Sequence, residues 1–335
     1  MIKVLVTGAT GFLGTNITHE LLDRGYQVRA FGLPNSETKY IAHDNVEIMF
    51  GDITIPESVN KAVEGTDIII HVAGDTSFWK KLFTRQRKIN VDGVRHVMQA
   101  ATEHKIQKVV HTATVDTIGY NPEGLADEHW DDDPANYNYA NTGYNYADTK
   151  REGEQIAFDY AQKGLDVTIL NPGSMMGPYD YTLQFGRLFM DIRDGNVPGI
   201  PCGGAPWAHV VEVAKAHVEA IEKGKPGERY ICGGVNETYE TQFKLIAESI
   251  GVEPPKSVMP RWILVTYARF CEFVSRFTKK PPELNPGMAR YMSVFPKYDS
   301  SKAQRELNFQ IVPLKKMIED ARDWYLENGL LELSS

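Results

Sequence analysis

Short runs of β-branched and apolar residues alternate with helical patterns along the first half of this chain. The runs are continuously apolar, which is expected of strands that helices cover on both faces. Alternation of this kind predicts an α/β protein with a doubly wound parallel sheet, a Rossmann fold. The runs expected to form strands are residues 2–8, 27–31, 46–52, 67–73, 108–114 and 166–172.

A glycine-rich turn follows the first predicted strand. In VTGATGFLG, Gly8, Gly11 and Gly14 are spaced three apart at the start of a predicted helix. A pyrophosphate must approach the backbone N–H groups at the positive end of that helix, and side chains at these positions would block it. The turn therefore predicts dinucleotide binding, with Thr10, Phe12 and Leu13 beside the glycines.

The end of the second predicted strand should distinguish NAD from NADP. A carboxylate that would bind the ribose is absent there, because Gly32 and Leu33 occupy the position. NADP is thereby admissible, although no arginine follows at once to select its phosphate, and Ser36 is a candidate donor. The sequence favours NADP slightly, and NAD stays open. Asp52, which ends the third strand, is a candidate contact for the adenine.

The composition and pattern of the sequence change after Pro172. Proline and glycine become frequent and the alternation of strands and helices is lost. A chain of 335 residues is long enough for a large α/β unit with a smaller appendage. We expect a dinucleotide-binding unit over residues 1–172. Residues 173–335 should form mainly a substrate-binding unit, with some segments returning to the sheet.

The composition limits the possible partners. The chain has 36 basic and 44 acidic residues, a net charge of −8, and no long basic run. We therefore expect neither a nucleic acid nor an anionic membrane surface as a partner. The three cysteines lie far apart without companion histidines, so no disulfide framework and no metal site are expected. The N-terminal stretch lacks the marks of a signal peptide, which predicts a cytoplasmic location.

Residues 262–277, WILVTYARFCEFVSRF, form the most apolar later segment. Arg269, Glu272 and Arg276 make it too polar to span a membrane, which takes about 20 apolar residues. An amphipathic helix packed on the protein is expected, and a helix lying on a membrane surface is the alternative.

Tyr146 and Lys150 are four residues apart in a predicted helix, so both can address one point in space. A nearby ammonium favours the phenolate form of a tyrosine, whose ordinary pKa is about 10. Tyr298 and Lys302 repeat the spacing, but they come late in the chain and are expected to be structural. Thr112 and Thr114, at the end of the fifth strand, are candidate hydroxyl partners.

Taken together, these motifs resemble the extended branch of the short-chain dehydrogenase/reductases, over nearly the whole chain. The resemblance rests on TGATGFLG, GDIT, HVAGDTSFW, INVDGVRHVMQAA, KVVHTATVDTIG, YADTK, LNPGSMMGP and YDSSKAQRELNF, in the family's order. Within that branch the chain is most similar to dihydroflavonol reductases, hydroxysteroid dehydrogenases and hopanoid-associated sugar epimerase-like proteins.

The resemblance implies roles for individual residues. Tyr146 matches the general acid/base, Lys150 the residue that holds the nicotinamide ribose and lowers the tyrosine pKa, and Thr114 the hydroxyl that orients the substrate oxygen. Asn90 matches a buried structural asparagine. The remaining matches to cofactor-binding positions are Asp52, Ile53, Ala73, Gly74, Thr112, Pro172 and Gly173.

Departures from the family pattern limit the reactions that this chain is expected to catalyse. Asp116 stands where sugar-nucleotide dehydratases have a catalytic glutamate, and Val115 replaces their neighbouring aspartate. Elimination of water requires both an acid and a base, so hydride transfer between a carbonyl and an alcohol is favoured. An NAD(P)-dependent epimerase or dehydratase acting on a sugar or nucleotide sugar, and a non-catalytic dinucleotide sensor, are the alternatives.

The sequence specifies the substrate contacts less closely than the cofactor contacts. The candidates are Asp75, Trp79, Thr114, Asp116, Tyr146 and Met175. By resemblance, we expect a small-molecule carbonyl or alcohol substrate and a homodimer that pairs through helices near residues 85–104 and 145–163.

Overall fold

The computed structural model describes residues 2–140, 142–278 and 280–333. Its centre is a seven-stranded sheet with the strand order β10-β6-β5-β4-β1-β2-β3, in which every pairing is parallel. This confirms the predicted doubly wound sheet. The six predicted strands are β1 (Lys3–Thr7), β2 (Gln27–Gly32), β3 (Val46–Phe50), β4 (Ile68–His71), β5 (Lys108–Thr112) and β6 (Val167–Pro172).

The seventh strand, β10 (Arg229–Cys232), comes from the second half of the chain and pairs with β6. Its carboxyl end lies beside Pro172. A segment from late in the chain therefore forms the edge of the sheet next to the loop that follows β6. The two edge strands are therefore β3 and β10.

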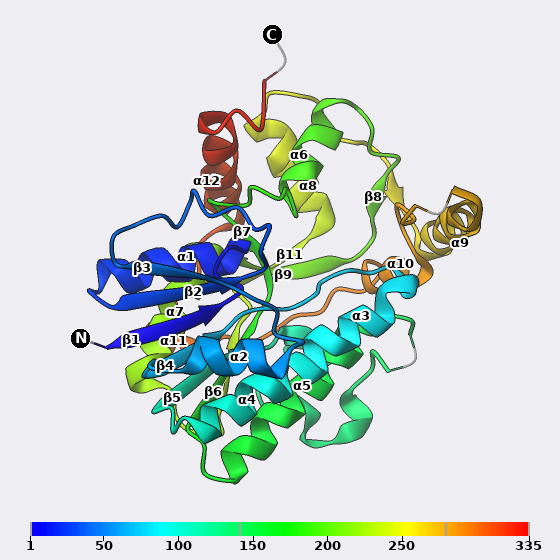
Figure 1. Ribbon diagram of the computed structural model, residues 1–335. Coiled ribbons are helices and arrows are strands. Elements are labelled where there is room, and N and C mark those ends of the chain that lie inside the picture. The colour runs from blue at the N-terminus through cyan, green and yellow to red at the C-terminus, as the bar shows by residue number, and fades with distance from the viewer. Residues whose placement is uncertain (1, 141, 279, 334–335) are drawn as a thin grey trace.

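Helices cover both faces of the sheet (Figure 1). Alternate residues of β1 enter opposite layers: Val4 and Val6 pack in one hydrophobic core and Leu5 in the other. The first layer contains α1 (Phe12–Asp23), α7 (Val210–Lys223) and α11 (Ser301–Leu307). The second contains α2 (Pro56–Val63), α4 (Val94–Glu103) and α5 (Asn145–Gln162). Ahead of α4 lie α3 (Phe83–Arg87) and a π-helical segment (Lys88–Gly93).

The remaining elements lie beyond the carboxyl ends of the strands (Figure 1). Two small sheets are present, with the orders β11-β9-β7 and β12-β8. A third core joins them to α6, α8 and α12 through Phe189, Phe243 and Tyr325. Their bounds are β7 (Ser174–Met176), β8 (Ile200–Pro201), β9 (Gly204–His209), β11 (Val235–Thr238), β12 (Val258–Met259), α6 (Gly186–Arg193), α8 (Tyr239–Ser249) and α12 (Leu314–Glu327).

Two further helices form a separate small cluster at the edge of the molecule. These are α9 (Arg261–Thr278) and α10 (Pro286–Tyr291), which pack through Leu264, Ala268 and Ala289. In the described part of the chain, no helix is long and apolar enough to cross a membrane.

Candidate active site

The glycine turn between β1 and α1 has the geometry that an anion cradle needs. Gly8 has φ +69°, and a Cβ there would lie 2.9 Å from the backbone of Ala73, at the end of β4. A Cβ at Gly14 would come within 2.1 Å of the carbonyl oxygen of Gly8. The N-terminus of α1 at Gly11 has no side-chain cap and no acidic residue in its first turn. Its N–H groups and helix dipole are therefore available to a pyrophosphate, and the turn fits a dinucleotide.

The predicted adenosine contacts lie beside this turn. A Cβ at Gly32 would lie 3.1 Å from the Thr10 hydroxyl and 3.5 Å from that of Ser36, so these residues gather at the end of β2. Leu33 is exposed, with no charge to accept or repel a 2′-phosphate. The Asp52 carboxylate accepts a hydrogen bond from the Thr54 N–H over 2.8 Å and so braces its own turn.

Ile53 and Gly173 are packed against the backbone around them. Ile53 is buried under Gly93, where an added Cβ would lie 2.7 Å from its Cδ1. A Cβ at Gly173 would come 2.7 Å from the carbonyl oxygen of Pro206, so the loop after β6 has no room for a side chain.

Tyr146 and Lys150 lie one turn apart in α5, as the spacing predicts. The side chain of Tyr146 is half-buried and that of Lys150 is buried. The Lys150 ammonium donates to the carbonyl oxygen of Thr112 over 2.7 Å. A Cβ at Gly74, three residues beyond the end of β4, would lie 3.8 Å from the same ammonium. Lys150 therefore bridges the carboxyl ends of β4 and β5.

Thr114 lies beside these residues, just beyond β5. It caps the one-turn helix Val115–Thr117 and accepts a hydrogen bond from the Asp116 N–H over 3.4 Å. Burial raises the pKa of Tyr146, and the nearby Asp116 carboxylate raises it further. A hydrogen bond with Thr114 lowers the Tyr146 pKa, because it favours the phenolate. The chain thus brings the three predicted catalytic residues together.

Burial lowers the pKa of Lys150 to about 8, and the charge of Glu154 opposes this shift. The neighbouring buried histidines, His71 and His111, also have lowered pKa values because they are buried. Burial thus opposes the charged form of all three groups.

Asp116 is buried at the same point. Its Oδ2 accepts a hydrogen bond from the Tyr144 hydroxyl over 2.7 Å, whereas its Oδ1 has no protein partner within the described residues. Burial raises the pKa of Asp116 to about 6, and the hydrogen bond from Tyr144 opposes the shift. A carboxylate with one free oxygen and such a pKa can exchange protons near neutral pH.

Aromatic rings line this part of the site. Tyr144 lies between Phe78, whose ring stacks on it at 5.5 Å, and Tyr291 of α10, whose ring centroid is 4.6 Å away. The sequence reasoning missed Tyr291, because it comes from a helix about half the chain away. No local signal marks it.

Asn90 organises the loop that carries Asp75. Its side chain accepts from the Asp75 N–H over 2.8 Å and donates to the Asp75 carbonyl over 3.0 Å and to the Thr149 hydroxyl over 3.1 Å. The buried asparagine therefore ties the end of β4 to α5, which is the structural role that the resemblance implies. The Asp75 carboxylate binds Arg85 over 2.8 Å and the Ser77 N–H over 2.9 Å, so it is occupied in shaping the loop.

Three other nominated residues lie around the site with their side chains engaged elsewhere. The Thr112 hydroxyl bonds to His217 over 2.9 Å, so only its carbonyl faces Lys150. Trp79 is half-buried at the start of a short helix, and the ring lies under the ammonium of Lys81. Met175 lies in β7 and packs against the first core. Tyr298, from the repeated spacing, donates to the carbonyl oxygen of Gly119 over 2.7 Å and is buried.

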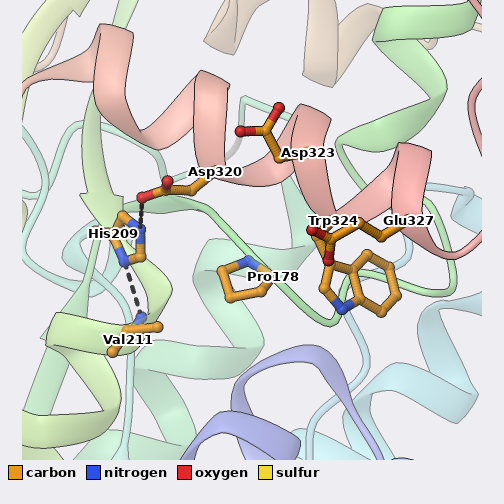
Figure 2. Close-up of a pocket in the computed structure, with 7 residues that line it drawn as sticks. All are labelled: Pro178, His209, Val211, Asp320, Asp323, Trp324 and Glu327. Atoms are coloured by element: carbon orange, nitrogen blue, oxygen red, sulfur yellow. Dashed lines mark hydrogen bonds and ion pairs between the residues drawn. The ribbon is translucent and has the colours of Figure 1, made fainter.

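A surface pocket of about 320 Å³ lies apart from these residues, between α12 and the start of α7 (Figure 2). His209 points to Asp320 across it, with 3.1 Å between His209 Nε2 and the carboxylate, and accepts from the Val211 N–H. Trp324 and Glu327 of α12 close its other end. None of its lining residues is a predicted catalytic residue.

The family model of the NAD dependent epimerase/dehydratase family matches residues 4–233, and the chain belongs to that family. It is therefore an NAD(P)-dependent enzyme of the extended short-chain dehydrogenase/reductase type, as the motifs predict.

Similar proteins include "Sterol demethylase protein B" of Methylococcus capsulatus, 31% identical over 98% of this chain and 99% of that protein. A "Putative dihydroflavonol 4-reductase" of Synechocystis is 28% identical over 98% of this chain and 95% of its own length. Among solved structures, that of gox2253 has a TM-score of 0.84 and 30% identity, covering 99% of this chain and 100% of that one.

Proposed function

We propose that the protein transfers a hydride between a nicotinamide and a substrate that is a ketone or aldehyde in one direction and an alcohol in the other. The proposal rests on one observation. Thr114, Tyr146 and Lys150 lie together at the carboxyl ends of β4 and β5. This is the edge at which open α/β sheets bind ligands. The glycine turn that fits a dinucleotide opens at the same edge, after β1.

The residues would divide the work as follows. The reduced nicotinamide, when bound, supplies a hydride to the carbonyl carbon. Thr114 and Tyr146 donate hydrogen bonds to the carbonyl oxygen, and the Tyr146 proton moves to that oxygen as the alcohol forms. The Lys150 ammonium, held by the Thr112 carbonyl, stabilises the resulting phenolate and binds the ribose. In the reverse direction Tyr146 accepts the proton.

The walls of the site favour a substrate with an apolar or ring-bearing body. Phe78, Tyr144 and Tyr291 present ring faces beside Asp116. A nucleotide diphosphate would require basic side chains instead. The name of one relative, a sterol demethylase protein, and that of another, a putative dihydroflavonol 4-reductase, agree with such a substrate.

The direct test is turnover of a panel of cyclic and aryl ketones by the purified protein, followed by the absorbance of the reduced nicotinamide and by identification of the alcohol. Stoichiometric formation of alcohol and oxidised cofactor is expected. If no carbonyl in the panel consumes either cofactor although both bind, the proposal is wrong.

Dehydration or epimerisation is the second candidate, because Asp116 keeps one unpartnered oxygen and a pKa of about 6. Such a reaction would convert a sugar substrate without net consumption of cofactor. Asp116→Asn would then abolish turnover, whereas simple hydride transfer should survive it. Comparing this variant with the parent on both substrate classes separates the two candidates.

The choice of cofactor can be tested at Leu33. We propose that NADP is accepted because no carboxylate stands at the end of β2, where Gly32 and the exposed Leu33 lie. Leu33→Arg adds a donor for the 2′-phosphate and should raise NADPH affinity about tenfold, with little effect on NADH. Fluorescence titration of the parent and of Leu33→Arg with each reduced cofactor measures this.

Pairing of two copies through the helices near 85–104 and 145–163, and a cytoplasmic location, remain predictions.

A further inference from the structure

Helix α9 has two apolar faces, and only one of them is used by the protein. Leu264, Ala268 and Ser275 are buried on the side that packs against α10 and Leu284. The opposite side exposes large apolar side chains, which we call the aromatic face. Its members, with their exposed fractions, are Trp262 (70%), Ile263 (36%), Phe270 (63%), Phe273 (55%), Val274 (37%) and Phe277 (73%).

This concentration is unusual within the molecule. Of the 17 large apolar residues that stand exposed in the described part of the chain, six lie on the aromatic face of this single helix. Scattered exposed apolar residues need no explanation, but a contiguous set marks a binding surface. The helix also stands at the edge of the molecule, away from the sheet (Figure 1). The helix packs against α10 through its smaller residues, as an amphipathic helix should, but most of its aromatic side chains stay exposed.

The charge of α9 is opposite to that of the whole chain. Arg261, Arg269 and Arg276 are exposed on it, and Glu272 is its one acidic residue, whereas the chain has a net charge of −8. At 100° per residue, Arg269 and Arg276 fall on one flank of the aromatic face, beside Trp262 and Phe273. A row of cations along a band of aromatic residues is the composition of a helix that lies in a membrane interface.

We propose that α9 docks the protein on an anionic phospholipid surface, with the aromatic face in the headgroup region and the arginines on lipid phosphates. The helix would lie in the plane of the membrane and would not cross it. A second copy of the chain is the less favoured occupant, because a symmetric pairing of two such faces would bring their arginine flanks together. This local positive charge is not apparent from the net charge of the whole chain, which is negative.

The surroundings of the helix fit a lipid partner. A hollow of about 240 Å³ opens beside the aromatic face, lined by Phe270, Val274, Pro281 and Pro282 among others. The lining also includes the Glu283 carboxylate, which accepts a hydrogen bond from the Tyr267 hydroxyl, and the apolar part of the hollow can accept an acyl chain.

Helix α9 is also linked to the candidate active site through α10, which packs on its buried side. Asn285, which caps α10, donates to the carbonyl oxygen of Phe78 over 2.7 Å, and Tyr291 of α10 lies against Tyr144. If the proposed function holds, docking would bring the mouth of the site close to substrates dissolved in the membrane. Docking itself does not depend on that function.

The test is cosedimentation of the full chain with vesicles of phosphatidylcholine alone and with added phosphatidylglycerol. Binding to the anionic vesicles is expected, and it should weaken as salt rises from about 0.1 M to about 1 M. Replacing Arg269 and Arg276 by alanine should weaken binding about fivefold for each arginine. The double variant Phe273→Ser with Phe277→Ser should weaken it at least tenfold.

Matched controls separate docking from misfolding and from self-association. Phe50→Ser removes an exposed phenylalanine of the edge strand β3 and should leave vesicle binding unchanged. Trp262→Phe keeps the apolar surface, so binding should persist while quenching of tryptophan fluorescence by brominated lipid falls. Circular dichroism and cofactor titration check that each variant is folded.

Three outcomes would overturn the proposal. The first is failure of the parent protein to bind anionic vesicles. The second is equal binding by the Phe273 and Phe277 double variant. The third is a concentration-dependent dimer, measured by analytical ultracentrifugation, that the double variant abolishes without any vesicle binding in the parent. Because cofactor binding and turnover are measured without vesicles, a failed docking test leaves the proposed reaction untouched.

Discussion

The buried ammonium of Lys150 donates a hydrogen bond to the carbonyl oxygen of Thr112 over 2.7 Å, at the point where β5 ends. The bond fixes the ammonium one helical turn from Tyr146, and burial there lowers the Lys150 pKa to about 8. Burying this charge weakens the fold. Such a destabilising charge is expected where a functional site needs it.

Lys150→Met should therefore stabilise the protein while reducing its activity. Because the folded pKa lies below the ordinary value of 10.5, the cost of the buried charge is fully present below pH 8 and disappears as pH rises to about 10.5. At neutral pH the cost is about 3 kcal/mol, partly offset by a hydrogen bond of about 1 kcal/mol. We expect a net gain of about 2 kcal/mol in the free energy of unfolding, and a loss of turnover of about 100-fold. Urea unfolding at neutral and at alkaline pH measures the first effect, and a gain that does not shrink with rising pH would contradict it.

Asp116→Asn should stabilise the protein increasingly as pH rises from about 4 to about 6, and by a constant amount above that. The folded pKa of about 6 lies above the ordinary 3.8, so protonation is favoured in the folded state. The corresponding stability is fully present below about pH 4 and is lost as pH rises through 6. Asparagine removes this loss, and its carbonyl can still accept from Tyr144. We expect a gain of about 3 kcal/mol at about pH 8 and almost none at about pH 4. Equal gains at both pH values would show that the charge is not the cause.

Gly14→Ala and Gly11→Ala should have different effects on the fold. A Cβ at Gly14 would lie 2.1 Å from the carbonyl oxygen of Gly8, whereas the nearest atom to a Cβ at Gly11 is 3.2 Å away. We expect Gly14→Ala to cost about 3 kcal/mol of stability and to distort the turn. Gly11→Ala should leave stability nearly unchanged but weaken cofactor binding, because a methyl group enters the cradle. Thermal unfolding and cofactor titration of both variants check this, and similar losses of stability would argue against the observed packing.

Much of the sheet could be predicted because its strands carry their own signal. All six predicted runs form strands of the parallel sheet, since β-branched residues in continuous runs suit strands buried on both faces. The sequence led us to expect that some later segments return to the sheet, but it did not locate strand β10 among them. Its four residues carry little pattern, and they depend on pairing with β6, about 60 residues earlier in the chain.

The predicted catalytic residues come together because each is tied to a strand end or to a helical spacing. Tyr291 and the connection from Asn285 to Phe78 could not be predicted, because they arise from the packing of α10 far along the chain. For α9, the sequence pattern predicted an amphipathic helix but not which side would face the protein. Both sides are apolar, and the smaller residues Leu264 and Ala268 were buried while the aromatic ones stayed outside.

In the proposed reaction the phenol of Tyr146 transfers the proton, and Tyr298 offers a control for that role. Tyr298 repeats the spacing to a lysine, yet its hydroxyl is bound to the carbonyl oxygen of Gly119 in the core. Tyr298→Phe should keep turnover near that of the parent once folding is verified. The decisive measurement is the turnover number of Tyr146→Phe on the identified carbonyl substrate, together with its cofactor affinity. We expect turnover to fall about 10²- to 10⁴-fold with cofactor affinity little changed, and undiminished turnover would contradict the role of Tyr146 as proton donor.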